Sequence, residues 1–485
     1  MNNFFIMSYI FAEFISVFHL CFIRGRQIAC VFAILFVCTT VNADDVDPRE
    51  FGFDLPSGAV VAGNDLAVET VDGSGAPVVA KTLVNIGRNR IVLLPDGELV
   101  ARYEGESPPA QRKFTPMSTE DLLKRLAKGL PRSAGLRAKK TRHYVYLYNT
   151  SEAFAEAASR ILESMIPGML THAKQQKITA HEPEVPLVAV MFRTREEFDA
   201  YRPMPEGVAA YYHTLSNQVV MYEESPLWRV KPELAFEQTI STIAHEGAHQ
   251  ILHNIGVQQR LSMWPMWLAE GLAEYYAPTS FNKKLRWKGA GQINDMRMFE
   301  LEIYLKGRGA AAPDGKMIEH TVSAARLTST GYASAWSLTH FLATNEKERF
   351  HEYMRRISKI GPFEGNADVV APGIIPDNLE LFRESFGGDL TTLEERLVKH
   401  LKSLNYSDPF GEWPHFVARV EVPGARKSHR EVNLFHSAEM ARKWVSETVE
   451  ALPEDQQSKA RRTIEGFPNR RAAEVFARQF LGSGK

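Results

Sequence analysis

Cysteine is scarce in this chain of 485 residues, and its three copies, Cys21, Cys30 and Cys38, all lie near the N-terminus. The rest of the chain can therefore form no disulfide, use no thiol nucleophile and build no cysteine-ligated zinc or iron–sulfur site. An excess of charge is also missing, because 57 Lys and Arg residues balance 58 Asp and Glu residues. This balance does not favour nucleic acid, and no nucleic-acid partner is expected.

The overall composition excludes two broad classes of protein. Hydrophobic residues make up 44% and charged residues 24% of the chain, close to the average of soluble globular proteins. Neither a wholly disordered chain nor a polytopic membrane protein fits these values. The length is too great for one ordinary domain and predicts two or three units. No internal repeat, long low-complexity tract or coiled-coil pattern is present.

The first 43 residues have the features of a secretory signal. Arg24 and Arg26 precede an apolar run over residues 28–38, and a stretch of smaller residues ends at Ala43. Such a signal would direct the protein to the periplasm or the outside medium and would be removed by cleavage after Ala43. An earlier apolar run over residues 3–23 leaves an alternative open, in which this segment stays as a membrane anchor. A mature chain without cysteine suits an oxidising compartment.

The strand and helix patterns beyond residue 43 predict an α+β protein. A mixed sheet is expected before residue 222, including a hairpin over residues 209–222 with residues 217–222 as its edge strand. A helical half is expected from residue 232. The expected units are a β-rich N-terminal unit at 44–115, a linker at 116–142, a principal domain at 143–404 and a mainly helical C-terminal unit at 405–485.

The strongest chemical signal is His245-Glu246-Gly247-Ala248-His249, within a segment of helical periodicity. Positions i and i+4 lie on one face of a helix, so His245 and His249 can bind one metal ion. Glu246 lies beside them, and such a carboxylate can take a proton from a water that the metal activates. The motif therefore predicts a hydrolytic metal site.

A second predicted helix begins near Pro265 and contains Trp-Leu-Ala-Glu-Gly at 267–271. Glu270 follows His249 by 21 positions, which leaves room for a helix, a loop and a return. Its carboxylate would complete a set of two His and one Glu. Zinc accepts this set and keeps one position for water, so one Zn²⁺ per chain is expected. Glu274, on the same helix, is the alternative third ligand.

These segments resemble the gluzincins, the clan of zinc peptidases that includes thermolysin and aminopeptidase N. The segment 267–271 resembles the one that supplies the third zinc ligand in aminopeptidase N, which implies that Glu270 is this ligand. Glu270 with Glu274 is similar to the thermolysin Glu-x-x-x-Asp pattern, which implies that Glu274 supports a zinc-bound His. The closest resemblance, over about residues 200–345, is to an uncharacterised family of exported bacterial proteins that are predicted peptidases. The resemblance implies a thermolysin-like catalytic domain and a peptide or protein substrate.

Tyr332 begins a segment that resembles the Tyr-x-x-Gly segment of aminopeptidase N, with Ala335 in place of Gly. The resemblance implies that the hydroxyl of Tyr332 stabilises the oxyanion of the tetrahedral intermediate. The alternative for Tyr332 is a packed aromatic residue at a helix end. The Gly-x-Met-Glu-Asn motif that captures a free N-terminus is absent, so an endopeptidase is expected rather than an aminopeptidase.

Two other functions stay open at this point. One is a catalytically silent, zinc-bearing binding module of the cell envelope, against which the intact Glu246 argues. The other is a zinc hydrolase of a different bond. His253 continues the i+4 series, but it is expected to be a helix-end residue. The basic pairs at 461–462 and 470–471 are expected on a solvated helix face.

Overall fold

The structure is a computed structural model that describes residues 45–129, 135–225, 232–282, 284–307, 312–364, 378–424 and 428–482. Helices account for 46% and strands for 21% of the residues that the structure describes, which confirms the predicted α+β class. The predicted signal or anchor, residues 1–43, lies outside the described residues. Within the described ranges, no helix combines the length and the hydropathy that a membrane span requires.

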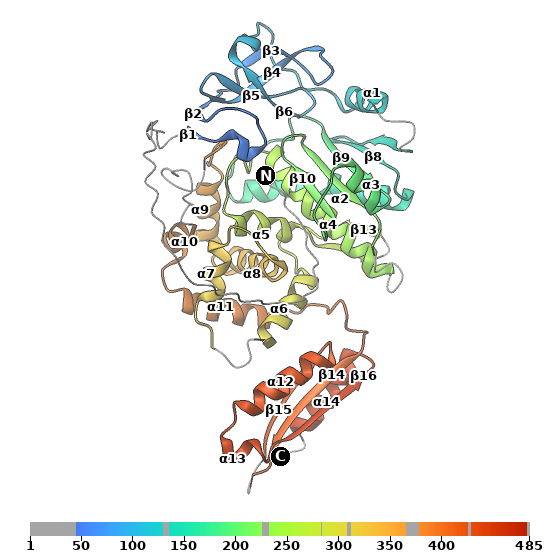
Figure 1. Cartoon of the computed structure of the whole chain (residues 1–485), viewed down its shortest axis with the longest axis vertical. Helices are drawn as coiled ribbons and strands as arrows, with labels where there is room; N and C mark the ends of the chain where they lie inside the picture. Colours follow the sequence, from blue (N-terminus) through green and yellow to red (C-terminus); the bar gives the residue numbers. More distant parts are fainter. Residues whose placement is uncertain are drawn as a thin grey trace, which may run out of the picture.

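Figure 1 shows a β-rich unit at one end of the long axis, a central domain, and a C-terminal unit at the other end. The N-terminal sheet has the order β1-β2-β4-β5-β6, and β3 pairs with β4. Alternate residues of β4, among them Val84 and Ile86, are buried against Ile91 and Leu99. The elements of this unit are β1 (Asp45–Val46), η1 (Pro48–Phe51), β2 (Gly58–Ala62), β3 (Ala67–Val71), β4 (Pro77–Ile86), β5 (Asn89–Leu93), β6 (Leu99–Tyr103) and η2 (Glu104–Glu106).

The central domain begins with a mixed five-stranded sheet in the order β10-β11-β9-β8-β7. The three inner strands are parallel, and both edge strands are antiparallel to their neighbours. Tyr144 and Tyr146 face the core that includes α2, whereas Val145 and Leu147 face α1 and α3. The elements are α1 (Thr119–Gly129), β7 (Arg137–Lys140), β8 (Tyr144–Tyr148), α2 (Glu152–Gln175), β9 (Leu187–Phe192), α3 (Arg195–Tyr201), β10 (Ala210–His213) and β11 (Gln218–Tyr222).

Two sequence-based expectations for this part of the chain are wrong. Residues 116–142 were expected to form a linker, but they contain α1 and the edge strand β7. The strand β7 is mostly exposed and polar, so it lacks the apolar alternation by which a strand is predicted. The other edge of the sheet is β10 rather than residues 217–222, because β11 lies between β10 and β9.

The helical half follows the sheet and shares its core. Trp267 of α5 and Trp336 of α8 are fully buried in this core, which extends to Leu401 of α11. A short hairpin interrupts the helices after α5. The elements are α4 (Pro232–Asn254), α5 (Met266–Tyr276), β12 (Thr279–Asn282), β13 (Lys284–Trp287), α6 (Asp295–Gly307), α7 (Lys316–Ser323), α8 (Ser329–Asn345), α9 (Lys347–Ile357), α10 (Asn378–Phe386) and α11 (Leu390–Ser403).

The C-terminal unit has a three-stranded antiparallel sheet in the order β15-β14-β16, with its own cores. These strands lie beside the helices of a unit that was expected to be mainly helical. In β15 and β16 nearly every residue is exposed or half-exposed, so their sequences lack a strand pattern, whereas the central β14 was predicted. The elements are β14 (His415–Val422), β15 (His429–Phe435), α12 (Ala438–Glu450), α13 (Glu454–Gln457), β16 (Arg461–Phe467) and α14 (Arg470–Gly482).

Candidate metal centre

Helix α4 carries three of the predicted site residues on its buried side. His245 is 1% exposed, and Glu246 and His249 are fully buried. Because the two imidazoles are one helical turn apart, their Nε2 atoms lie 3.2 Å from each other. The helix ends before Gly256, whose φ of +81° lies in the left-handed region that favours glycine.

Helix α5 brings Glu270 to the same point. Its Oε2 atom lies 3.1 Å from Nε2 of His245 and 3.5 Å from Nε2 of His249. The carboxylate is fully buried, and neither of its oxygens makes a hydrogen bond of acceptable geometry within the described part of the chain. The two helices thus bring three ligand atoms to one small volume, all within 4.8 Å of one another.

The spacing of these atoms fits a tetrahedral zinc ion. With metal–ligand bonds of about 2.0–2.1 Å, a tetrahedron has edges of about 3.3–3.4 Å. The three measured distances, 3.1, 3.2 and 3.5 Å, bracket this edge. The buried carboxylate of Glu270 faces two imidazole nitrogens without well-formed hydrogen bonds. A positive charge between these three groups would compensate for the burial of the carboxylate. The donor set and its geometry therefore fit zinc.

Glu274, one turn after Glu270, orients the first imidazole. Its Oε1 atom lies 3.0 Å from Nδ1 of His245, so Nδ1 can carry the proton and Nε2 is left as the ligand atom. Arg297 and Asn294 hold Glu274 in turn, through Nη2 at 2.7 Å and Nδ2 at 2.8 Å. Burial alone would raise the pKa of Glu274, but Arg297 and His245 keep it well below its usual range. Glu274 thus stays ionised against Nδ1 of His245.

Glu246 lies between the candidate metal ligands and the edge of the sheet. Its Oε2 atom accepts a hydrogen bond of 2.8 Å from the backbone N–H of Tyr212 in β10, while Oε1 is buried without a partner. Burial raises the pKa of Glu246 to about 8, against the lowering effect of His245. A carboxyl group with a pKa near neutrality can both accept and return a proton.

Tyr332 lies in the first turn of α8, beside the ligands. The centroid of its ring is 6.1 Å from that of His245, and the guanidinium of Arg297 lies 5.5 Å from the ring. Burial and the nearby carboxylates of Glu270 and Glu246 raise the pKa of Tyr332 far above its usual value. The phenol therefore keeps its proton and can donate it in a hydrogen bond.

A cavity of about 110 Å³ is lined by neighbours of the site residues, although none of the three candidate ligands lines it. Tyr212, Ala269 and His253 form the part of its wall nearest the site. His253 is the last residue but one of α4, as predicted, and burial lowers its pKa to about 3. Phe51 of the N-terminal unit also lines the cavity, so this unit forms part of the surroundings of the site.

Sequence reasoning missed the partners that act on the site from other elements. Asn294, Arg297 and the amide of Tyr212 carry no local motif, because their roles depend on how α6 and β10 pack against α4 and α5. Arg297 is buried, and a buried arginine often marks a functional site. Its burial is known only from the folded chain, so the sequence could not show it.

Comparison with known protein families finds a domain at residues 239–364 that matches the family described as Protein of unknown function (DUF1570). No curated protein matches the chain. The matched segment contains all six predicted site residues, His245, Glu246, His249, Glu270, Glu274 and Tyr332. The family description names no activity, so the geometry of these residues carries the functional argument.

Proposed function

We propose that the protein is an exported zinc-dependent peptidase that cuts within peptide chains. The observation that carries this proposal is the meeting of Nε2 of His245, Nε2 of His249 and Oε2 of Glu270 at the edge lengths of a zinc tetrahedron, with Glu246 beside them. When bound, zinc supplies Lewis acidity toward the scissile carbonyl and lowers the pKa of a water molecule. The signal-like N-terminus supports export.

Each surrounding residue has a role in this reaction. Glu246 accepts a proton from the attacking water and returns it to the leaving amine. Glu274 holds the ring of His245 in the tautomer that leaves Nε2 free for the metal. The neutral phenol of Tyr332 donates a hydrogen bond to the oxyanion of the tetrahedral intermediate.

A peptide substrate is supported by the sheet edge at the site. Among the described strands, β10 pairs only with β11, and the N–H of its Tyr212 points away from β11 toward Glu246. Backbone groups alternate along an antiparallel strand, so those of Ala210 point to the same outer side. An extended peptide can add to such an edge through backbone hydrogen bonds, which would place its scissile bond near Glu246.

The substitution Glu246→Gln tests the proposal. It keeps the shape of the side chain and removes the base, so zinc content should stay at the wild-type level while peptide cleavage falls by about 10²–10⁴-fold. Cleavage is measured with a library of internally quenched peptides, and zinc by elemental mass spectrometry. Equal cleavage by the wild type and the variant would sink the proposed mechanism.

The burial of the site favours one competing function, a catalytically silent zinc module of the cell envelope. All three ligand residues are at most 1% exposed, so a substrate reaches them only if the covering segments move. The same library decides between the two, because a silent module binds zinc and cuts no peptide even in the wild type. Ester and amide substrates are assayed beside the peptides, because a hydrolase of another bond would cleave one of them and leave the peptides intact.

A further inference from the structure

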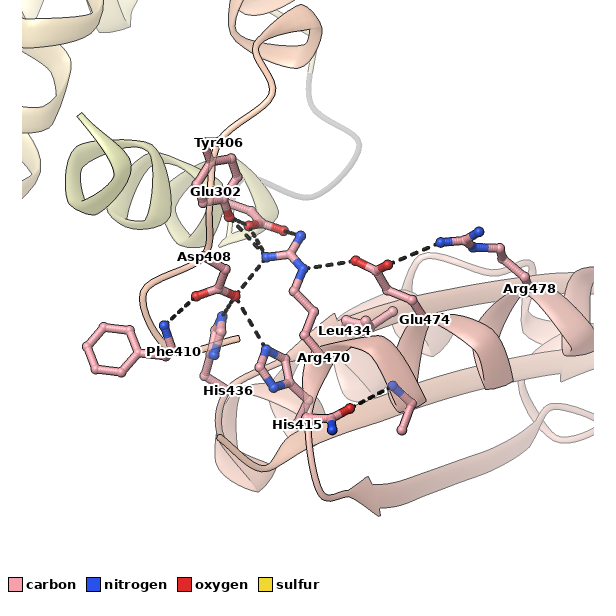
Figure 2. Close-up of polar contacts among 12 residues, drawn as sticks. Glu302, Tyr406, Asp408, Phe410, His415, Leu434, His436, Arg470, Glu474 and Arg478 are labelled. Carbon is pink, nitrogen blue, oxygen red and sulfur yellow. Dashed lines mark hydrogen bonds and ion pairs between the residues drawn. The ribbon is translucent and has the colours of Figure 1, made fainter. Parts of the chain in front are cut away.

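A second group of metal-binding side chains lies where the central domain meets the C-terminal unit (Figure 2). Asp408 comes from the segment before β14, His415 from the first residue of β14, and His436 from the residue after β15. Oδ2 of Asp408 lies 3.5 Å from Nε2 of His415 and 3.7 Å from Nε2 of His436. All three ligand atoms lie within 4.8 Å of one another.

His415 is set in the form that binds metals. Its Nδ1 atom lies 2.7 Å from the carbonyl oxygen of Trp413, so Nδ1 carries the proton and donates it to that oxygen. The lone pair of Nε2 then faces Oδ2 of Asp408, which is also an acceptor. Nε2 is buried and has no hydrogen-bond partner in the described part of the chain. Two buried acceptors that face each other call for a cation between them.

His436 completes the set from the other side. Its ring centroid lies 4.3 Å from that of His415, and its side chain is 18% exposed, which gives solvent a route to the group. Burial lowers the pKa of His436, although Asp408 opposes this.

Arg470 contacts the same oxygen of Asp408, at 2.8 Å from Nη1, and is itself neutralised. Both oxygens of Glu302 in α6 accept from its guanidinium at 2.9 Å, and Glu474 accepts from Nε at 2.9 Å. Lys306 pairs with Glu302 as well. Arg478 pairs with Glu474 at 3.1 Å. The three carboxylates and three cations of this cluster therefore balance to zero with neutral imidazoles, so no net positive charge opposes a divalent ion. A carboxylate oxygen has two lone pairs, and Arg470 needs only one of them.

We propose that Asp408, His415 and His436 form a second metal site, for a zinc-like divalent transition ion, with water in the remaining position. Two imidazoles and a carboxylate are donors that zinc accepts. The two Asp–His distances exceed the edge of a zinc tetrahedron, about 3.3–3.4 Å, by less than about 0.5 Å, so small side-chain rotations close the site. The ion would join the segment before β14 to the end of β15, next to the contact of Arg470 with α6. The site is independent of the proposed peptidase activity.

The test is the zinc content per purified full-length chain, measured by elemental mass spectrometry after dialysis. With both sites present, the wild type should hold two zinc ions, His436→Ala one, His249→Ala one, and the double variant none. His429→Ala is the matched control, because His429 lies exposed on the same sheet and should leave two. Asp408→Asn keeps the volume of the side chain and should weaken the second ion at least tenfold, so the test does not depend on how His436→Ala folds.

The outcomes separate the two sites. One zinc in the wild type that His249→Ala removes, with His436→Ala and Asp408→Asn unchanged, overturns the second site. One zinc that His436→Ala removes and His249→Ala keeps supports the second site and overturns the peptidase centre. No zinc in the wild type overturns both.

Discussion

Glu274 shows at the scale of a residue how the site is organised beyond its ligands. It contacts His245 on one side and Arg297 on the other, and both groups are buried. We expect Glu274→Gln to weaken zinc binding by about 10–100-fold, because the amide orients the ring of His245 less strongly. Affinity is measured by competition with a chromogenic chelator.

The matched control is Glu300→Gln, because Glu300 accepts a hydrogen bond of 2.7 Å from Nη1 of the same Arg297. It should leave zinc affinity unchanged. Equal losses in the two variants would show that the charge balance around Arg297, rather than the orientation of His245, sets the affinity.

His245 also sets the pH dependence of zinc binding. Burial lowers the pKa of His245, but Glu274 and Glu270 outweigh this effect and raise it to about 10 in the metal-free site. The imidazole therefore holds a proton at pH 7, and zinc must displace it. In the Glu246→Gln background, we expect zinc affinity to rise about tenfold per pH unit near neutrality and about one proton to be released. Calorimetry in two buffers of different ionisation enthalpy measures the release, and a pH-independent affinity would contradict it.

The relation between His245 and His249 could be predicted from the sequence, because i and i+4 always share a helix face. The choice of Glu270 rather than Glu274 as the third candidate ligand depends on where α5 returns to α4, and only the resemblance indicated it. Arg297 and Asn294 could not be predicted, since each acts across a contact between elements far apart in the chain.

At the scale of the elements, two glycines let the helices of the site approach closely. A Cβ atom at Gly271 of α5 would lie 2.6 Å from the backbone oxygen of Ala335 in α8 and would overlap the Thr339 side chain. A Cβ atom at Gly247 of α4 would meet only the end of the Leu162 side chain, which can move. The glycine after Glu270 is thus explained by the packing of α5 on α8.

We expect Gly271→Ala to destabilise the protein by about 1–3 kcal/mol and to reduce zinc content, because α5 carries Glu270. Gly247→Ala should cost less, since the side chain of Leu162 can rotate. Thermal unfolding and zinc content of the two variants check this order. A larger loss of stability and of zinc content in Gly247→Ala than in Gly271→Ala would mean that α2, rather than α8, sets the position of the candidate ligands.

The elements that sequence reasoning predicted were those with a buried face. The inner strands β8 and β9 are buried along their whole length, and β14 is buried at alternate positions. The strands β7, β15 and β16 are mostly exposed or half-exposed, so their existence depends on a neighbouring strand rather than on their own pattern. The choice of β10 as the sheet edge likewise depends on a parallel pairing between β11 and β9.

At the scale of the whole molecule, polar contacts join the flanking units to the central domain, buried at the N-terminal end and half-buried at the C-terminal end. Arg260, between α4 and α5, donates to the backbone oxygen of Gly97 in the N-terminal unit at 2.7 Å and to that of Leu215 at 3.0 Å. At the other end, Arg470 joins the C-terminal unit to Glu302 of α6. Both contacts span long stretches of sequence, so no local pattern could have indicated them.

The central claim is that His245, His249 and Glu270 bind zinc. The most direct test compares the zinc content of the full-length wild-type chain with that of His249→Ala, by elemental mass spectrometry on matched preparations. The geometry predicts that the variant holds about one zinc fewer per chain than the wild type, whatever a second site contributes. The same zinc content in both proteins would contradict the claim and remove the basis for the proposed peptidase.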